Sequence, residues 1–172
     1  ASIGPFSIRQ KYEKIMGDHL NKVNKIFARE TETVSYLSQI GVKHNVVQVA
    51  DPAFVMKPLK PSSHNLSMIP RDSIGLNFSP LMAFYVTNGN LNQWRDMVKT
   101  IISKISFELG CKIFLIPHVT IPGEFNNDHE FLLSVMLDLP AGCDVELVPD
   151  SLNAEELKWI ISSMKIFVGA RT

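Results

Sequence analysis

Hydrophobic and polar positions along the chain switch repeatedly between a strand-like and a helix-like period. Short apolar runs that predict strands lie at residues 25–29, 45–50, 73–78, 112–117, 144–148 and 166–169. Apolar positions at helical spacing predict helices over residues 7–23, 31–40, 92–109, 128–139 and 153–164. Residues 81–90 fit neither period and predict a loop or a short helix. This alternation predicts an α/β fold with Rossmann-like, doubly wound parallel sheets.

The end of the chain combines a predicted strand with a basic residue. The β-prone residues Ile166 to Gly169 predict a short buried strand, and Arg171 follows at its carboxyl end. Ligands of open α/β sheets bind at this end of the strands, where an arginine can donate two hydrogen bonds to a carboxylate or phosphate. Spacing alone favours a plainer interpretation, in which Arg171 pairs with a nearby acid.

One segment separates the strand–helix units into two groups. Residues 58–71 contain several prolines and serines and have no periodicity, so they predict a linker between two domains. The sequence stops one residue after Arg171, close to a predicted sheet edge. We therefore expect the chain to be a fragment of a longer protein.

Composition excludes few classes of protein. Hydrophobic residues make up 45% of the chain, charged residues 20%, and the formal net charge is zero. This balance gives no long-range attraction for nucleic acid or an anionic membrane. No apolar run approaches the roughly 20 residues that span a bilayer. Cys111 and Cys143 lack metal-site spacing and predict reduced thiols, which suggests the cytosol.

Polar residues that follow the predicted strands are the candidates for chemistry. They are Arg29, Glu30, Asp51, Asn77, Ser79, His118 and Arg171, with Asp128 at the start of a predicted helix. In a doubly wound fold these positions share one sheet edge, or two facing edges if there are two domains.

Each candidate also has a plainer interpretation. Asp51 precedes a proline and is a common turn residue, whereas Asn77 and Ser79 are typical caps of backbone groups. His118 fits an ordinary loop position, and Asp128 fits a helix N-cap. His118, Asp128 and His129 match no standard metal-site spacing, so we predict no metal site.

Several short stretches become more specific when they are taken together in order. They are Ser2-Ile3-Gly4-Pro5-Phe6, Ala28-Arg29-Glu30, Ala50-Asp51-Pro52-Ala53-Phe54, Gly75-Leu76-Asn77-Phe78-Ser79-Pro80, Pro117-His118-Val119-Thr120 with Asn127-Asp128, and Phe167-Val168-Gly169-Ala170-Arg171. The series resembles the polysaccharide pyruvyl transferase family over essentially the whole chain.

The resemblance implies an architecture and a reaction. The family has two facing Rossmann-like domains, similar to GT-B glycosyltransferases, and its site lies in the cleft between them. Residues 1–57 would then be the latter part of the N-terminal domain, and residues 72–172 the first part of the C-terminal domain. Characterised members transfer pyruvate from phosphoenolpyruvate to a sugar, usually as a ketal, and release phosphate.

The resemblance also implies roles for the candidate residues. Arg29 and Arg171 would neutralise the carboxylate and phosphate of phosphoenolpyruvate, and His118 would act in proton transfer. The family usually has a second histidine two places after the arginine, which here lies past Thr172, so we expect this fragment alone to be inactive. Asn77, Ser79 and Asp128 would position the sugar or the backbone. Glu30 and Asp51 would be structural or line the cleft.

The expected partners follow from that reaction. Phosphoenolpyruvate is the co-substrate, the acceptor is a sugar or a lipid-linked saccharide, and no cofactor, metal or nucleic acid is expected. The expected location is the cytoplasm, or the inner face of the membrane, with no transmembrane segment. Two alternatives stay open: a GT-B-type glycosyltransferase that uses a nucleotide sugar, with Arg171 on its diphosphate, and a non-catalytic member of the same fold.

Overall fold

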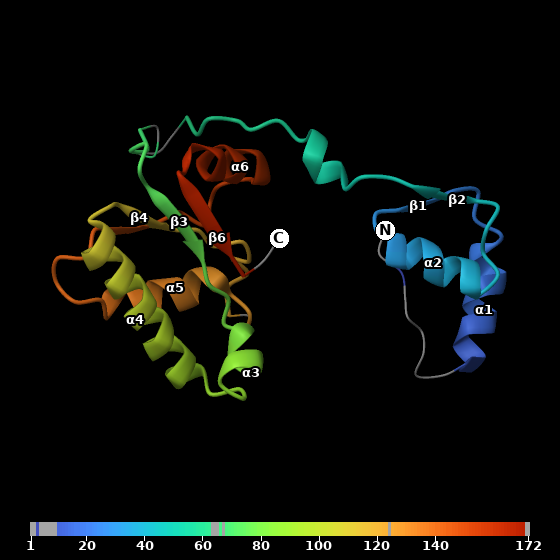
Figure 1. The fold of residues 1–172 in the computed structure, drawn as a ribbon, viewed down its shortest axis with the longest axis horizontal. Helices are drawn as coiled ribbons and strands as arrows, with labels where there is room; N and C mark the ends of the chain where they lie inside the picture. The colour runs from blue at the N-terminus through green and yellow to red at the C-terminus, as the bar shows by residue number, and fades with distance from the viewer. Residues whose placement is uncertain (1–2, 4–9, 63–65, 67, 124, 171–172) are drawn as a thin grey trace. The chain divides into compact units, whose positions relative to one another are not determined.

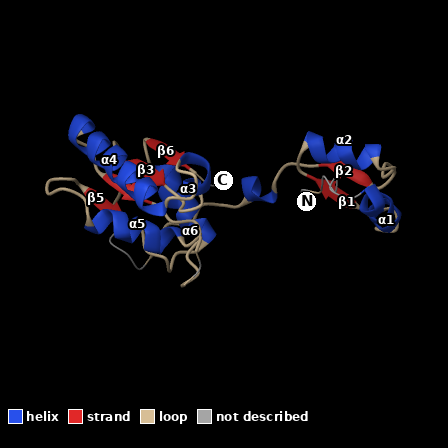
Figure 2. Cartoon of the chain, turned by 90° about the horizontal axis from the view of Figure 1, so that it is seen from below, coloured by secondary structure: helices blue, strands red, loops and turns tan. Residues whose placement is uncertain are grey.

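The computed structural model describes residues 3, 10–62, 66, 68–123 and 125–170. The chain divides into two compact units, Ala1–Met56 and Lys57–Thr172. Each unit combines helices with parallel strands (Figures 1 and 2), which confirms the predicted α/β class with parallel sheets. No helix within the described ranges is long and apolar enough to cross a membrane.

The first unit is built on a pair of parallel strands. Its elements are α1 (Gln10–Leu20), β1 (Ile26–Ala28), α2 (Thr31–Gln39), β2 (Val46–Gln48) and the 3-10 helix η1 (Pro52–Val55). β1 pairs with β2 with Phe27 opposite Val47. Ile26 and Ala28 are buried whereas Phe27 is 56% exposed, so one face of this pair carries the core. That core consists of Leu20, Ile26, Leu37 and Val42.

The two ends of α2 are formed differently. The N-cap is Glu30, whose side chain makes no cap hydrogen bond. At the other end Ile40 is the C-cap, and Gly41 follows directly with φ of +85°. This left-handed conformation suits glycine and explains why the helix ends here.

The second unit contains a four-stranded parallel sheet. Its strands are β3 (Ile74–Asn77), β4 (Ile113–Leu115), β5 (Val145–Leu147) and β6 (Ile166–Gly169). Their order is β5-β4-β3-β6, so the chain runs outward from β3 to β5 and then returns to the other side of β3. The reversal of direction makes the crevice between β3 and β6 the topological switch point of the sheet.

Helices cover both faces of this sheet (Figure 1). The helices of this unit are α3 (Met82–Val86), α4 (Leu91–Leu109), α5 (Asp128–Leu137) and α6 (Ala154–Ser163), of which α4 and α5 cover one face and α6 the other. Sheet residues Ile74, Leu76, Ile113 and Leu115 share one core with α4 and α5. Phe114 shares the core on the opposite face with Ile160 of α6. β3 and β4 are therefore buried on both faces, which for β4 agrees with its uninterrupted apolar run.

The prediction of a strand at 166–169 is confirmed by β6, but the prediction that this strand is buried is wrong. Ile166 and Val168 are 50% and 54% exposed, and only Phe167 joins a core. β6 pairs with β3 on one side and has no strand on its other side within the described residues, so it is an edge strand there. A short apolar run does not distinguish a central strand from an edge strand, because both have the same residue preferences.

Helix starts in this unit depend on asparagine caps. Asn90, Asn127 and Asn153 accept hydrogen bonds from the backbone N–H three residues later in α4, α5 and α6. The ambiguous residues 81–90 form the short helix α3 and the turn that leads into α4. The interpretation of Asp128 as a helix N-cap is wrong, because Asn127 holds that position and Asp128 is the first helical residue.

The proline-rich stretch predicted as a linker belongs to the second compact unit, and three of its described residues contact the rest of that unit. The N–H of Leu59 donates to the carbonyl of Glu155 at 3.0 Å, and Leu66 is buried in the core beside α6. The ammonium of Lys60 lies 5.6 Å from the centre of the Trp159 ring. The division into two Rossmann-like domains with a linker at 58–71 stays a prediction.

Candidate functional site

The carboxyl ends of β3 and β6 meet in register at the switch point. Asn77, the last residue of β3, lies opposite Gly169, the last residue of β6. The N–H of Ala170 donates to the carbonyl of Asn77 at 3.0 Å. In open α/β sheets ligands bind outside the strand ends at this point, so this edge is the candidate site of the second unit.

Asp128 fastens three segments of the chain together at this edge. Its Oδ2 accepts hydrogen bonds from Asn77 Nδ2 and from the backbone N–H groups of His118 and Val119, each at 3.2 Å. Its own N–H donates to the carbonyl of Val119 at 2.7 Å. The first turn of a helix also favours a negative charge. The end of β3, the loop after β4 and the start of α5 are therefore joined through one carboxylate.

Asn77 and Asp128 are buried too deeply for their side chains to contact a sugar directly. Asp128 is fully buried and Asn77 is 1% exposed. Asn77 Nδ2 also donates to the carbonyl of Ile116 at 2.9 Å, next to the end of β4. Both side chains are enclosed by protein and hydrogen-bonded, which favours a positioning role over the predicted contact with substrate.

The imidazole of His118, in the loop after β4, stacks on an aromatic ring of β6, which is separated from β4 by β3 in the sheet. The His118 and Phe167 ring centres are 5.9 Å apart, with 20° between the ring planes. Phe167 lies close to β3 because residue 75 is glycine: a Cβ there would be 3.0 Å from Phe167 Cδ2. Gly75, Phe167 and the Asp128 carboxylate together fix the half-buried His118 at both its ring and its backbone.

Ser79 has the plainer of its two predicted roles. It is 2% exposed, and its Oγ accepts a hydrogen bond from the N–H of Leu81 at 3.2 Å. Its carbonyl accepts the indole N–H of Trp94 at 2.9 Å. Ser79 thus caps the turn after β3 and ties it to α4.

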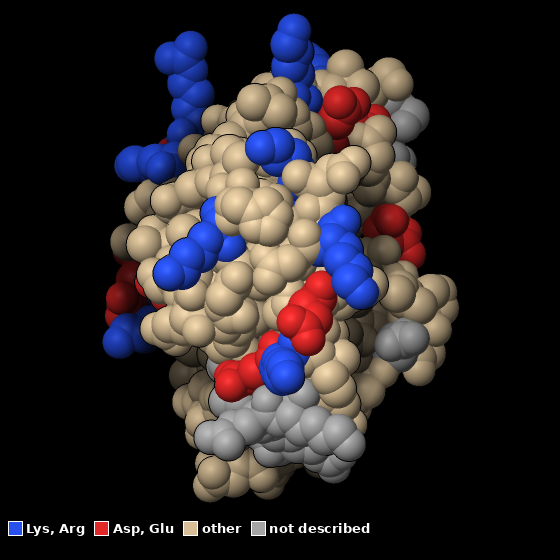
Figure 3. All heavy atoms as spheres, turned by 90° about the vertical axis from the view of Figure 1, so that its right-hand side faces the viewer, with Lys and Arg blue, Asp and Glu red and all other residues tan. Residues whose placement is uncertain are grey.

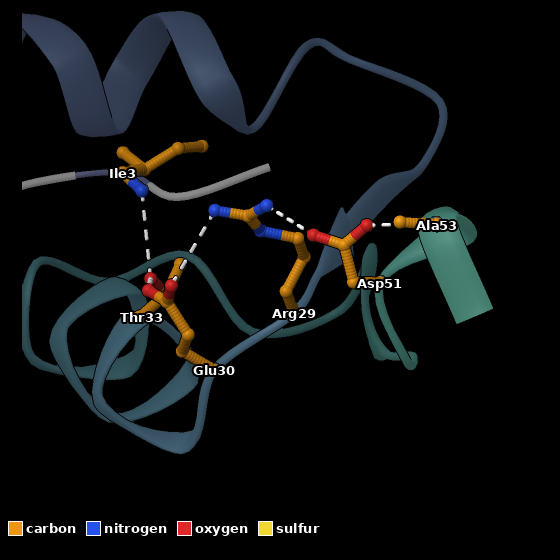
Figure 4. A network of polar contacts seen from close by, with 6 residues as sticks. All are labelled: Ile3, Arg29, Glu30, Thr33, Asp51 and Ala53. Atoms are coloured by element: carbon orange, nitrogen blue, oxygen red, sulfur yellow. Dashed lines mark hydrogen bonds and ion pairs between the residues drawn. The ribbon is translucent and has the colours of Figure 1, made fainter. Parts of the chain in front are cut away.

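In the first unit a network of ion pairs surrounds Arg29 (Figure 4). Its guanidinium pairs with the carboxylate of Asp51 and, at 3.6 Å, with that of Glu30. The other oxygen of Asp51 accepts the N–H of Ala53 at 2.8 Å, which places Asp51 at the start of η1. The hydrogen bond from Ala53, followed by that from Arg29, holds the pKa of Asp51 below its ordinary value.

This network orients Arg29 and offsets part of its charge. Glu30 is itself held, because Thr33 Oγ1 donates to its Oε2 at 3.3 Å. The Arg29 side chain is 40% exposed, so an anion in solvent has access to it. Glu30 and Asp51 therefore hold Arg29 within this unit, and their predicted place along a cleft stays a prediction. On the face shown in Figure 3, basic and acidic side chains are interspersed, in line with the zero net charge.

The structure brings the predicted residues together in two groups. Arg29, Glu30 and Asp51 form one group, and Asn77, His118 and Asp128 form the other. Arg171 lies outside the described residues. Within the described ranges no group of three or more His, Cys, Asp or Glu side chains is arranged to hold a metal ion.

Sequence reasoning missed two contributors to the second group. Gly75 and Phe167 fix the His118 ring, and both lie in stretches that carry the family resemblance. The signal that could have indicated them is a glycine inside a predicted buried strand. Such a glycine marks a close approach of another group.

The fold and the site define an α/β protein with parallel sheets whose polar groups converge at the carboxyl ends of the strands. A model of one family, polysaccharide pyruvyl transferase, matches residues 1–172, so the chain belongs to the polysaccharide pyruvyl transferase family. No curated protein and no solved structure matches the chain.

Proposed function

We propose that the protein transfers the pyruvyl group of phosphoenolpyruvate to hydroxyl groups of a saccharide and releases phosphate. The observation that carries this proposal is the family match over the whole chain. The arrangement of His118 at the switch point of a parallel sheet supports it, because that is where such folds bind ligands. We also propose the two-domain, GT-B-like architecture that the resemblance implies.

The reaction needs charge neutralisation and two kinds of proton transfer. Protonation of the donor's methylene carbon makes a methyl group and leaves C2 open to attack by a saccharide hydroxyl. The C2–oxygen bond to phosphate breaks, phosphate leaves, and a second hydroxyl adds to C2 to close the ketal. Each hydroxyl loses its proton, so one group must act as acid and another as base.

Within this proposal His118 is the proton-transfer group of the second unit. Its backbone is fixed by Asp128, and its ring is fixed by the stack on Phe167. Fixed placement matters, because a displacement of about 1 Å can cost about 100-fold in rate. Asn77 and Asp128 act as positioning residues, and Ser79 maintains the turn after β3.

The anionic groups of phosphoenolpyruvate require cationic partners. Arg171 follows the switch-point strand β6 in the sequence, and we propose that it binds the donor. Arg29 supplies a second guanidinium for the same donor, oriented by Asp51 and Glu30. A guanidinium suits this task because it donates two parallel hydrogen bonds to a carboxylate or phosphate.

Phosphate release tests the proposal. The full-length protein is incubated with phosphoenolpyruvate and a panel of saccharides, and inorganic phosphate is measured. We expect release that depends on one of the saccharides. His118→Asn should lower it by about 100-fold or more, since general acid–base catalysis contributes that much. His129→Asn is the matched control on α5 and should leave the rate unchanged.

Two other results would overturn the proposal. Transfer from a nucleotide sugar, without phosphate release from phosphoenolpyruvate, would identify a glycosyltransferase. Absence of both reactions, in a protein that still binds a saccharide, would identify a non-catalytic member of the fold.

A further inference from the structure

Two exposed aromatic rings, one on a short helix and one on a loop, lie together in the second unit. Phe84 is 57% exposed and Phe125 is 59% exposed, and their ring centres are 5.6 Å apart. Phe84 belongs to α3, and Phe125 belongs to the loop between β4 and α5. We call these two residues the aromatic pair. Exposed aromatic side chains that gather from separate segments mark binding surfaces more often than isolated ones do.

The aromatic pair is on the same edge of the sheet as the candidate site. α3 follows the carboxyl end of β3, and Figure 1 shows it beyond the ends of β3 and β6. The loop that carries Phe125 begins at the end of β4 and includes His118. The aromatic pair and His118 are therefore presented by connections from adjacent strands at one sheet edge.

The segments that carry the two aromatic side chains are held in place by local contacts. Phe84 lies against Gly89, where a Cβ would be 3.7 Å from Phe84 Cδ1, and φ of Gly89 is +84°. On the other segment, Asn127 Nδ2 donates to the carbonyl of Ile121 at 2.9 Å. The N–H of Gly123 donates to Glu130 Oε1 at 3.1 Å. Such preorganisation lowers the entropy cost of binding a ligand.

The chain around the aromatic pair has little charge. Residues 79–94 contain no Lys, Arg, Asp or Glu, and residues 118–127 contain no Lys or Arg. An anionic lipid surface or a phosphorylated ligand would be expected to meet basic side chains here. The sequence beside Phe84 instead provides a neutral hydrogen-bonding residue, the exposed Asn88. This combination of aromatic rings and neutral polar groups suits an uncharged ligand.

We propose that Phe84 and Phe125 form a subsite for an uncharged sugar ring of the saccharide acceptor. This proposal rests on the proposed function, which supplies a saccharide as the acceptor. The apolar C–H face of a sugar ring packs on an aromatic ring, while its hydroxyl groups remain hydrated or meet neutral polar side chains. The subsite holds a sugar ring at the sheet edge to which His118 belongs.

Binding of simple glycosides to the full-length protein tests the subsite. The probes are the methyl glycosides of glucose, galactose, mannose and N-acetylglucosamine, with saturation-transfer NMR and titration as readouts. At least one glycoside should bind, with contact through its ring C–H protons. Phe84→Ala and Phe125→Ala should each weaken that binding by about fivefold to tenfold, as expected for loss of one aromatic contact.

Control variants separate this role from general effects on folding. Phe107→Ala removes a ring that is 58% exposed near the end of α4 and should leave glycoside binding unchanged. Phe84→Tyr keeps an aromatic ring and should retain binding. Circular dichroism identifies any variant that fails to fold, in which case the conservative Phe125→Tyr and Phe125→Leu pair gives the comparison.

The outcomes distinguish the subsite from the proposed function. Glycoside binding that is weakened in both alanine variants supports the subsite even if no phosphate is released from phosphoenolpyruvate. Unchanged binding in those variants, or no binding of any glycoside, would overturn it even if phosphate release is normal. Loss of binding to phosphatidylglycerol vesicles in those variants, with glycoside binding intact, would instead assign the aromatic pair to a membrane surface.

Discussion

Replacement of Asp128 is the sharpest perturbation of the second unit. Its Oδ2 is the acceptor for three donors, and the residue is fully buried. Asp128→Ala would leave these donors without this acceptor, at about 1–3 kcal/mol for each buried group that stays unsatisfied. The N–H groups of His118 and Val119 make only partly buried hydrogen bonds, so water can replace their partner. We therefore expect a loss of about 1–3 kcal/mol in the free energy of unfolding, mainly from the buried Asn77 Nδ2.

Asp128→Asn is a milder version of the same change. The asparagine oxygen can still accept hydrogen bonds, but they lose the assistance of a charged acceptor. The expected loss is about 1–2 kcal/mol, the difference between charged and neutral hydrogen bonds over this set. Because the His118 backbone is held less firmly, the rate of phosphate release should also fall, with the KM for phosphoenolpyruvate little changed.

Urea unfolding measures the effect on stability. Trp94 is 5% exposed in one core and Trp159 packs in the other, so tryptophan fluorescence reports on both faces of the sheet. Asp150→Asn removes an exposed carboxylate after β5 and should change stability by less than about 0.5 kcal/mol. If Asp128→Asn and Asp128→Ala unfolded at the wild-type urea concentration, the carboxylate would not hold this edge together.

Three further predictions concern close contacts and charge. Gly75→Ala should destabilise the second unit by about 1–3 kcal/mol in urea unfolding, because the new Cβ would be 3.0 Å from Phe167 Cδ2. NMR should also show a changed ring-current shift of the His118 ring, which stacks on Phe167. Gly17→Ala should lower the melting temperature of the first unit, since its Cβ would be 2.7 Å from the carbonyl oxygen of Ile40 and backbone cannot yield easily; an unchanged melting curve would refute this contact. The pKa of Asp51 is lower in the folded state than its ordinary 3.8, so its contribution to stability is present above that value and is lost as the pH falls through the folded pKa. Asp51→Asn should therefore reduce the loss of stability on acidification, and parallel acid titrations of both proteins would contradict the pairing.

The local pattern of the sequence predicted most elements because it reports on burial and capping. Within the predicted range 112–117, Ile113–Leu115 form the central strand β4, which is buried on both faces as an uninterrupted apolar run indicates. Asn153 begins α6 with a capping box to Glu156, as the asparagine and the following acidic residues predict. The exposure of β6 could not be predicted in this way, because it depends on which strands pair beside it.

The sequence predicted which residues of the candidate site follow the strand ends, but it did not predict which side chains contact one another there. Parallel strands place their carboxyl ends at one edge, so His118 and Asn77 belong together in any such sheet. The stack of His118 on Phe167 depends on strand order, which places β6 beside β3. The burial of Asp128 likewise depends on how the loop after β4 folds back onto α5.

Analysis of the saccharide product is the most direct test of the proposed transfer of pyruvate from phosphoenolpyruvate to a saccharide. Phosphoenolpyruvate labelled with carbon-13 at C2 is incubated with the full-length protein and the acceptor that supports phosphate release. We predict a saccharide whose mass increases by that of one pyruvic acid less one water, with the labelled carbon at the chemical shift of a ketal. Release of labelled pyruvate with an unmodified saccharide, or a product that carries a sugar from a nucleotide donor and no label, would contradict it.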